Sequence, residues 1–199
     1  MSATLELLVE VGWSGATTRL IAQRAGMSQG ALQHHFPDRA GLAVAALHRL
    51  AAELAAQIAS RPRPTGGERE RLAAGLDLLW EIHNTPPLIA YLELATASRT
   101  DPGLAPHVAG LTVSVTDLVL DLAAGLAPER AASGELRGFV LTALATMRGT
   151  VLLDPLHADA ARADWATMRA VLLAGLPAPQ AGPAGGREEE PAARAAPGS

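Results

Sequence analysis

Apolar residues recur at spacings of three and four along almost the whole chain, and this periodicity limits the possible folds more than any other feature. Such spacing places apolar side chains on one face of an α-helix, whereas a half-buried strand needs alternation with a period of two, which is nowhere sustained. Proline and glycine interrupt the pattern at intervals, and helices are expected to end or begin there. The sequence therefore predicts an all-α fold.

The N-terminal segment predicts three short helices, one that ends near Gly12, a second at 18–25 and a third at 29–35. Two short helices that cross steeply need a small residue at their contact and a residue that tolerates positive φ in their turn. Ala22 and Gly26 meet these needs. The apolar residues expected to lock the pair are Ile21, Ala25, Met27 and Leu32. This pattern indicates a helix-turn-helix, in which the second helix can enter the major groove of DNA.

A longer helix is predicted after Phe36-Pro37-Asp38, where the Asp38 carboxylate is placed to cap it. Its expected buried stripe consists of Leu47, Leu50, Leu54 and Ile58. The run Thr65-Gly66-Gly67-Glu68 has the spacing of a capping box and predicts the start of the next helix. Further helices are expected from Pro86-Pro87, from Asp101-Pro102 to Leu126, from Ser133 to about Leu153, and from about Ala161 to Leu176.

Three regions follow from this pattern. Residues 1–45 are predicted to form a helix-turn-helix DNA-binding head, and residues 46–176 a helical body that is the candidate region for ligand binding and dimerisation. Residues 177–199 are rich in proline, alanine and glycine and poor in large apolar side chains, so they are expected to be a disordered tail.

Charge and composition exclude several classes of function. The chain has no cysteine, which removes thiol chemistry and disulfides. Its formal charge of −4 is uneven, because residues 1–63 carry six arginines against four acids, a net +2, and the rest carries −6. No basic n-region opens the chain and no uninterrupted apolar run approaches the roughly 18 residues of a membrane span. We expect a cytoplasmic protein with no membrane partner.

The head resembles the DNA-binding signature of TetR-type repressors over about residues 3–47. The residues that carry this resemblance are Gly12, Thr17, Thr18, Ile21, Ala22, Arg24, Ala25, Gly26, Ser28, Gly30, Leu32, His35, Phe36, Pro37 and Arg39. The resemblance implies phosphate contacts from Thr17, Thr18, Ser28, Gln33 and Arg39, and base contacts from Gln29, Gly30, Ala31 and His34. The body resembles this family only loosely, through Tyr91-Leu92-Glu93-Leu94, Arg99-Thr100-Asp101-Pro102 and Arg148-Gly149.

The chain departs from the family pattern at two points. Gln33 stands where members usually have a tyrosine, so an amide replaces a phenolic phosphate contact. The first helix of the head is truncated, because Met1 falls roughly in the middle of the family's helix. The residues left to cover the head core are Leu5, Leu7, Leu8 and Val11.

Two surfaces of the body are candidates for binding. A ligand cavity lined by aromatic and polar side chains is expected from Trp80, His83, Tyr91, Thr96, Met147 and Trp165, although each could equally be an ordinary core or surface residue. The last two helices carry small residues within apolar stripes and predict a two-helix dimerisation face, with closure of each subunit's own core as the alternative. These residues are Gly138, Ala145 and Gly149, with Leu136, Val140, Leu144, Met147, Val151, Trp165, Met168 and Leu172.

No catalytic, cofactor or metal site is expected. Adjacent histidines at His34-His35 point in different directions on a helix, and Asp117 and Asp121 have no partnering nucleophile or base. The hypothesis is therefore a homodimeric regulator, in the manner of a repressor, that a small-molecule effector releases from a palindromic double-stranded DNA operator. The alternative is a ligand-binding helical dimer whose DNA binding is lost or weakened.

Overall fold

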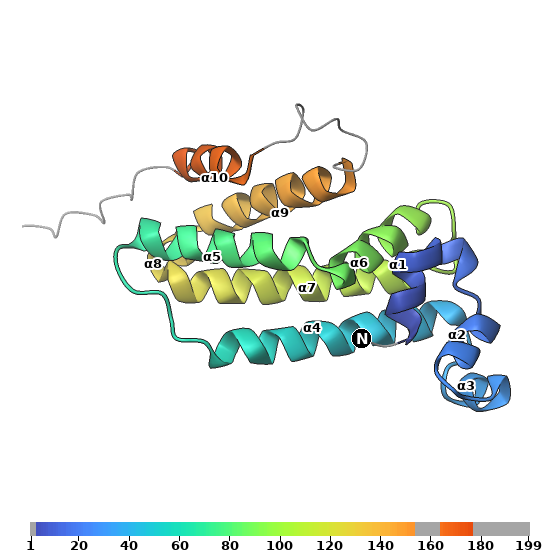
Figure 1. Cartoon of the computed structure of the whole chain (residues 1–199). Helices are drawn as coiled ribbons and strands as arrows, with labels where there is room; N and C mark the ends of the chain where they lie inside the picture. Colours follow the sequence, from blue (N-terminus) through green and yellow to red (C-terminus); the bar gives the residue numbers. More distant parts are fainter. Residues whose placement is uncertain (1–2, 154–163, 177–199) are drawn as a thin grey trace, which may run out of the picture.

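The computed structural model describes residues 3–153 and 164–176, and all regular elements in these ranges are α-helices. They are α1 (Ala3–Gly15), α2 (Thr18–Arg24), α3 (Gln29–His35), α4 (Arg39–Ser60), α5 (Glu68–His83), α6 (Pro86–Ala97), α7 (Ala105–Leu126), α8 (Pro128–Ser133), α9 (Glu135–Leu153) and α10 (Trp165–Ala174). Helices α1 to α3 gather at one end of a bundle formed by the longer helices (Figure 1). The predicted all-α class, with a helix-turn-helix head and a helical body, is confirmed.

The first helix differs from its prediction, because it continues to Gly15 across a break at Gly12. Gly12 has φ of 68° and ψ of −179°, which interrupts the helical hydrogen bonds there. Leu5, Leu7 and Leu8 are at most 2% exposed, as expected of the head core. Val11 was expected to join them but is 47% exposed, because it lies on the outer face of the turn before the break.

Helix α4 begins as predicted, and Asp38 Oδ1 accepts a hydrogen bond from the Gly41 N–H at 2.6 Å. Its predicted buried stripe is only partly right. Leu47 is buried, but the three residues further along the stripe, Leu50, Leu54 and Ile58, are only half-buried. The side chains that α4 buries lie in its first half, at Ala40, Leu42, Ala43, Val44 and Leu47.

Two predicted helix boundaries were wrong. The capping box lies two residues later than expected, since α5 begins after Gly67 and the Glu70 carboxylate accepts from the Gly67 N–H at 2.8 Å. Pro128 was expected only to end α7, but it also occupies the first position of α8, where proline loses no helical hydrogen bond. Gly134, with φ of 80°, then separates α8 from α9.

The buried side chains form two clusters. The first joins α1 to α4 with α6 and the start of α7, so the head shares its core with part of the body. The second joins α5, the C-terminal half of α7, α9 and α10. Arg130, only 6% exposed, contacts Glu68 and Glu135 and thereby connects the starts of α5 and α9 through α8.

Three helices of the described part are long and apolar enough to cross a membrane, judged by length and composition alone. They are α4, α7 and α9, with mean hydropathies of 1.3, 1.5 and 1.3. The sequence predicted no span because polar residues such as His48 and Asp117 interrupt their apolar runs. All three helices pack against other helices of the bundle. The predicted start of the last helix near Ala161 and the predicted tail at 177–199 lie outside the described residues.

Candidate functional site

The helix-turn-helix is built by two capped helices and a left-handed glycine. Thr17 Oγ1 accepts a hydrogen bond from the Leu20 N–H at 3.3 Å, and Ser28 Oγ accepts one from the Ala31 N–H at 3.1 Å. These bonds satisfy N–H groups that a helix start leaves free. Gly26, with φ of 68°, turns the chain between the two helices, a conformation that a side chain would disfavour.

Fewer apolar residues lock the two helices than the sequence predicted. Ile21, Ala22 and Leu32 are at most 4% exposed and hold α2 against α3. Ala25 and Met27 were expected in the same core but are exposed, Met27 by 42%. Both flank Gly26 in the turn, which lies on the outside of the head, so the periodicity of the helices does not apply there.

Most of the residues that the resemblance implies in DNA contacts lie at the surface of the head. Thr17, Ser28, Gln29, Gly30, Ala31, Gln33 and His34 are exposed, and Thr18 is half-buried. Within α3 only Leu32 is buried, so every other side chain of this helix is available to a partner. A Cβ at Gly30 would meet no atom within 4 Å, so the packing of the chain itself does not require glycine there.

Most of the arginines of the head are engaged within the protein. Arg24 contacts Glu10 at 2.8 Å and Glu6 at 3.5 Å, and its guanidinium holds the pKa of Glu10 below the usual value. Arg39 donates a hydrogen bond to the carbonyl oxygen of Trp13 at 2.9 Å, and its guanidinium lies 3.7 Å from the centre of the indole ring. Arg19 is exposed and has no ion pair or hydrogen bond to the described residues. From the sequence, Arg19 was included only in the net charge of residues 1–63 and was not predicted to contact DNA.

The body contains a cavity of about 460 Å³ between α4, α5, α7 and α9. Its walls are largely apolar, with Leu72, Leu79, Val119 and Phe139 among them. The segment between α4 and α5 adds arginines to the lining. A volume and lining of this kind suit a small apolar molecule.

None of the six residues predicted to bind a ligand lines this cavity. Trp80 and Trp165 stack at 4.8 Å between ring centres and join α5 to α10. Met147 is fully buried in the second core cluster, and Thr96 is exposed beside the contact between head and body. The structure therefore does not bring the six together, and their assignment to a ligand stays a prediction.

Two of these residues, His83 on α5 and Tyr91 on α6, are buried and each lies near Arg148 of α9. His83 is 3% exposed, its Nδ1 lies 2.7 Å from the carbonyl oxygen of Leu79, and its Nε2 has no hydrogen-bond partner. Burial has the largest effect and lowers the pKa of His83. The hydrogen bond to the Leu79 carbonyl opposes it, and the positive charge of Arg148 lowers the pKa by the smallest amount. The Tyr91 hydroxyl lies 3.0 Å from Thr112 Oγ1, and the Arg148 guanidinium lies 5.3 Å from the Tyr91 ring.

Helix α9 has an inner and an outer face. The apolar stripe predicted for dimerisation is largely internal, since Leu136, Val140, Leu144 and Met147 are buried in the second core cluster. The small residues Gly138 and Ala145 are exposed on the outer face, where Leu141 and Leu152 are 41% and 50% exposed. No atom lies within 4 Å of a Cβ built at Gly138 or Gly149.

Comparison with known proteins identifies relatives of the head and of the whole fold. The model of the tetR family of bacterial regulatory proteins matches residues 1–46. An HTH-type transcriptional repressor from Mycobacterium tuberculosis is 38% identical over 112 residues, which are 54% of this chain and 56% of that protein. The chain thus aligns with just over half the length of this curated relative.

Solved structures share the fold over most of the described helices. A transcriptional regulator from Rhodococcus sp. Rha1 superposes with a TM-score of 0.66 at 19% identity, over 87% of this chain and 91% of that one. The multidrug binding protein EbrR, solved in complex with imidazole, gives a TM-score of 0.58 at 26% identity, over 89% and 92%. The matched family and the curated relative are regulators rather than enzymes, as the sequence predicted. Residues 1–46 of the chain therefore match the tetR family of bacterial regulatory proteins, and the helical fold over most of the chain is shared with solved regulators.

Proposed function

We propose that this protein is a transcriptional regulator that binds a palindromic double-stranded DNA operator as a homodimer, in the manner of a repressor, and that a small molecule releases it. The observation that carries this proposal is the surface of α3, where every side chain except that of Leu32 is available to a partner. Helices α2 and α3 are packed together behind this surface by Ile21, Ala22 and Leu32. Such a helix can enter the major groove with its first residues at the base edges.

The proposed contacts divide into those that read bases and those that bind phosphates. Gln29, Gly30, Ala31 and His34 lie on the exposed surface of α3 and are proposed to face the bases. The open space above Gly30 allows DNA to approach the backbone closely. The proposed phosphate contacts are Thr17, Thr18, Ser28 and Gln33. Arg19, which is exposed and has no ion pair within the described part of the chain, is added to them.

Gel-shift titration against the upstream region of the protein's own gene tests this proposal. The wild type is expected to form a specific complex. Thr18→Ala is expected to weaken binding to all operators alike, whereas His34→Ala changes the preference between operators by roughly 1–3 kcal/mol at one position. No specific complex with the wild type would support the alternative of a ligand-binding dimer without DNA binding.

The effector is proposed to bind in the cavity between α4, α5, α7 and α9. The support is its largely apolar lining, together with the small-molecule complex of the structurally similar EbrR. Ala123 on α7 lines the cavity, and Ala123→Phe would fill part of it. Ala109→Phe, an exposed position on the same helix, is the matched control.

The apolar dye 8-anilinonaphthalene-1-sulfonate is a suitable probe for this cavity. We expect its fluorescence enhancement to fall several-fold in Ala123→Phe and to stay at the wild-type level in Ala109→Phe. Equal fluorescence enhancement in the wild type and in both variants would mean that the dye binds elsewhere. It would contradict the proposal that the effector binds in this cavity. A cytoplasmic location is proposed together with the regulatory function, since the operator lies there.

A further inference from the structure

The head and the body meet at a compact polar contact, which we call the head–body joint. It consists of Trp13 on α1, Arg39 at the start of α4, Glu93 on α6 and Asp101 before α7. The Trp13 N–H donates to Glu93 Oε1 at 2.6 Å, and its indole Nε1–H donates to Asp101 Oδ2 at 3.1 Å. Arg39 donates to the Trp13 carbonyl at 2.9 Å and covers the ring at 3.7 Å. All polar groups of Trp13 are therefore bonded to residues outside the head helix that carries it.

The break at Gly12 makes this arrangement possible. In a continuous helix the Trp13 N–H and C=O would bond to residues four positions away. With φ of 68° at Gly12, the Trp13 N–H is instead free to bond to Glu93. The Trp13 C=O is free to accept from Arg39 because α1 ends at Gly15 and the Thr17 N–H bonds to the Gly15 carbonyl. A Cβ at position 12 would lie 2.8 Å from Glu93 Oε1, so glycine also allows α6 to approach this closely.

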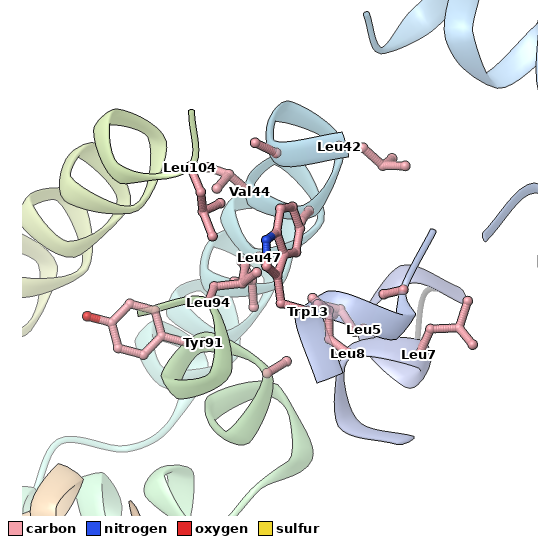
Figure 2. Close-up of a cluster of buried hydrophobic side chains, with 14 of the residues drawn as sticks. Leu5, Leu7, Leu8, Trp13, Leu42, Val44, Leu47, Tyr91, Leu94 and Leu104 are labelled. Atoms are coloured by element: carbon pink, nitrogen blue, oxygen red, sulfur yellow. The ribbon is translucent and has the colours of Figure 1, made fainter. Parts of the chain in front are cut away.

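Trp13 is the central side chain of the joint. It is 6% exposed and lies in the first core cluster, between α1, α4 and α6 (Figure 2). Figure 2 shows its indole ring beside Val44 and Leu47 of α4 and Leu94 of α6. The bonds from Trp13 therefore fix α1 of the head to two helices of the body simultaneously.

The guanidinium of Arg39 is partly buried against the Trp13 ring. Burial lowers its pKa, against a smaller opposing effect of the Asp101 carboxylate. The indole N–H of Trp13 contributes most to holding the pKa of Asp101 below its usual value. The Arg39 cation thus lies over the Trp13 ring and gives one N–H to the Trp13 carbonyl, while the Asp101 carboxylate accepts from the edge of the same ring.

We propose that Arg39 is a positioning residue, which fixes the orientation of the helix-turn-helix head relative to the body through Trp13, rather than a phosphate contact. This inference rests on the proposed function, because two heads of a dimer must match half-sites about one helical turn of DNA apart. Glu93 has the same role from the body, although it is not on an element of the helix-turn-helix.

Operator binding measured over a range of salt concentrations separates the two roles. Each lost phosphate contact makes the negative slope of log K against log salt concentration shallower by about 0.9. One lost contact in each subunit therefore makes it shallower by roughly 2 in a dimer. Arg39→Gln and Glu93→Ala are each expected to weaken binding at least tenfold with the slope unchanged. The double variant is expected to bind the operator with the same affinity as the single variant that binds it more weakly, since both residues act through Trp13. Arg19→Gln is the control that should lower the slope.

Spin-label distances test the joint without DNA. The chain has no cysteine, so labels at Gln23→Cys in the head and Asp117→Cys on α7 are unique. Labelled subunits diluted into unlabelled protein are expected to give a narrow distance distribution, which becomes at least twice as wide in Arg39→Gln and Glu93→Ala. Circular dichroism of each variant confirms that the helices are retained.

The outcomes separate this inference from the proposed function. An unchanged distance distribution in Arg39→Gln, or a slope lowered by about 2 with no effect of Glu93→Ala, would overturn the positioning role. Absence of any specific complex with the wild type would overturn the proposed function, while the spin-label distances would still decide whether Arg39 orients the head.

Discussion

At the scale of single residues, His83 provides a test of a buried titratable group. Its pKa is lowered in the folded protein, mainly by burial, and returns to about 6.5 on unfolding. Below that pH the His83 side chain is protonated in the unfolded chain but not in the folded protein. The free energy of unfolding therefore falls as the pH decreases from about 6.5. His83→Gln is expected to flatten this dependence in urea unfolding between pH 7.5 and 5.5. His107→Gln, at an exposed position, should keep the wild-type slope; if both variants behave alike, His83 does not cause the loss.

Residues whose role depends on neighbours in sequence were the easiest to predict. Asp38 caps α4 because its carboxylate needs only the N–H three residues later. Ala22, Gly26 and Leu32 follow from the geometry of one short helix pair. Arg39 could not be placed in this way, since its partner Trp13 lies 26 positions earlier and accepts through a carbonyl that is free because α1 ends at Gly15.

At the scale of elements, α10 is held on α5 by a small set of polar and aromatic contacts. Asp77 Oδ1 accepts from the Trp165 indole N–H at 2.9 Å and lies 2.9 Å from Arg169 Nε. Asp77→Ala removes both contacts and is expected to destabilise the protein by roughly 1 kcal/mol, since the ion pair is partly exposed. Urea unfolding followed by tryptophan fluorescence measures this loss. Asp117→Ala, an exposed aspartate on α7, should be neutral, and an equal effect there would argue against the Asp77 contacts.

The existence of the helices could be predicted more reliably than their ends or buried faces. The periodicity indicated α4 correctly, yet it placed the buried stripe through Leu54 and Ile58, which are only half-buried, whereas the buried side chains of α4 lie in its first half. The capping box was read from Thr65 to Glu68, whereas the carboxylate that completes it belongs to Glu70. Local patterns specify a helix, but the neighbouring elements decide which part of it is buried.

At the scale of the whole molecule, the outer face of α9 is the proposed centre of the homodimer. Exposed small residues alternate there with exposed leucines, so two copies could approach closely. Ala145→Arg is expected to reduce the mass in sedimentation equilibrium from about twice 20.5 kDa to 20.5 kDa and to weaken operator binding at least tenfold. Ala109→Arg on α7 should remain dimeric. A dimer that survives Ala145→Arg would require a different interface.

The head could be predicted in more detail than the body. Its helix pair occupies consecutive residues, so the spacing of Ala22, Gly26 and Leu32 carries the geometry within one short segment. The cavity of the body has walls from α4, α5, α7 and α9, which are brought together only by the tertiary fold. Aromatic residues suggested a ligand site at Trp80 and Trp165, but their rings stack on each other instead.

The three tryptophans of this chain also give it a set of built-in optical reporters. Trp13 lies against a guanidinium at the contact between head and body, so its emission is sensitive to movement of the head. The ring planes of Trp80 and Trp165 are parallel within 1° at 4.8 Å, so the near-ultraviolet circular dichroism of this pair is expected to report on the contact between α5 and α10. Emission and dichroism can therefore follow the two ends of the molecule separately in one unlabelled sample.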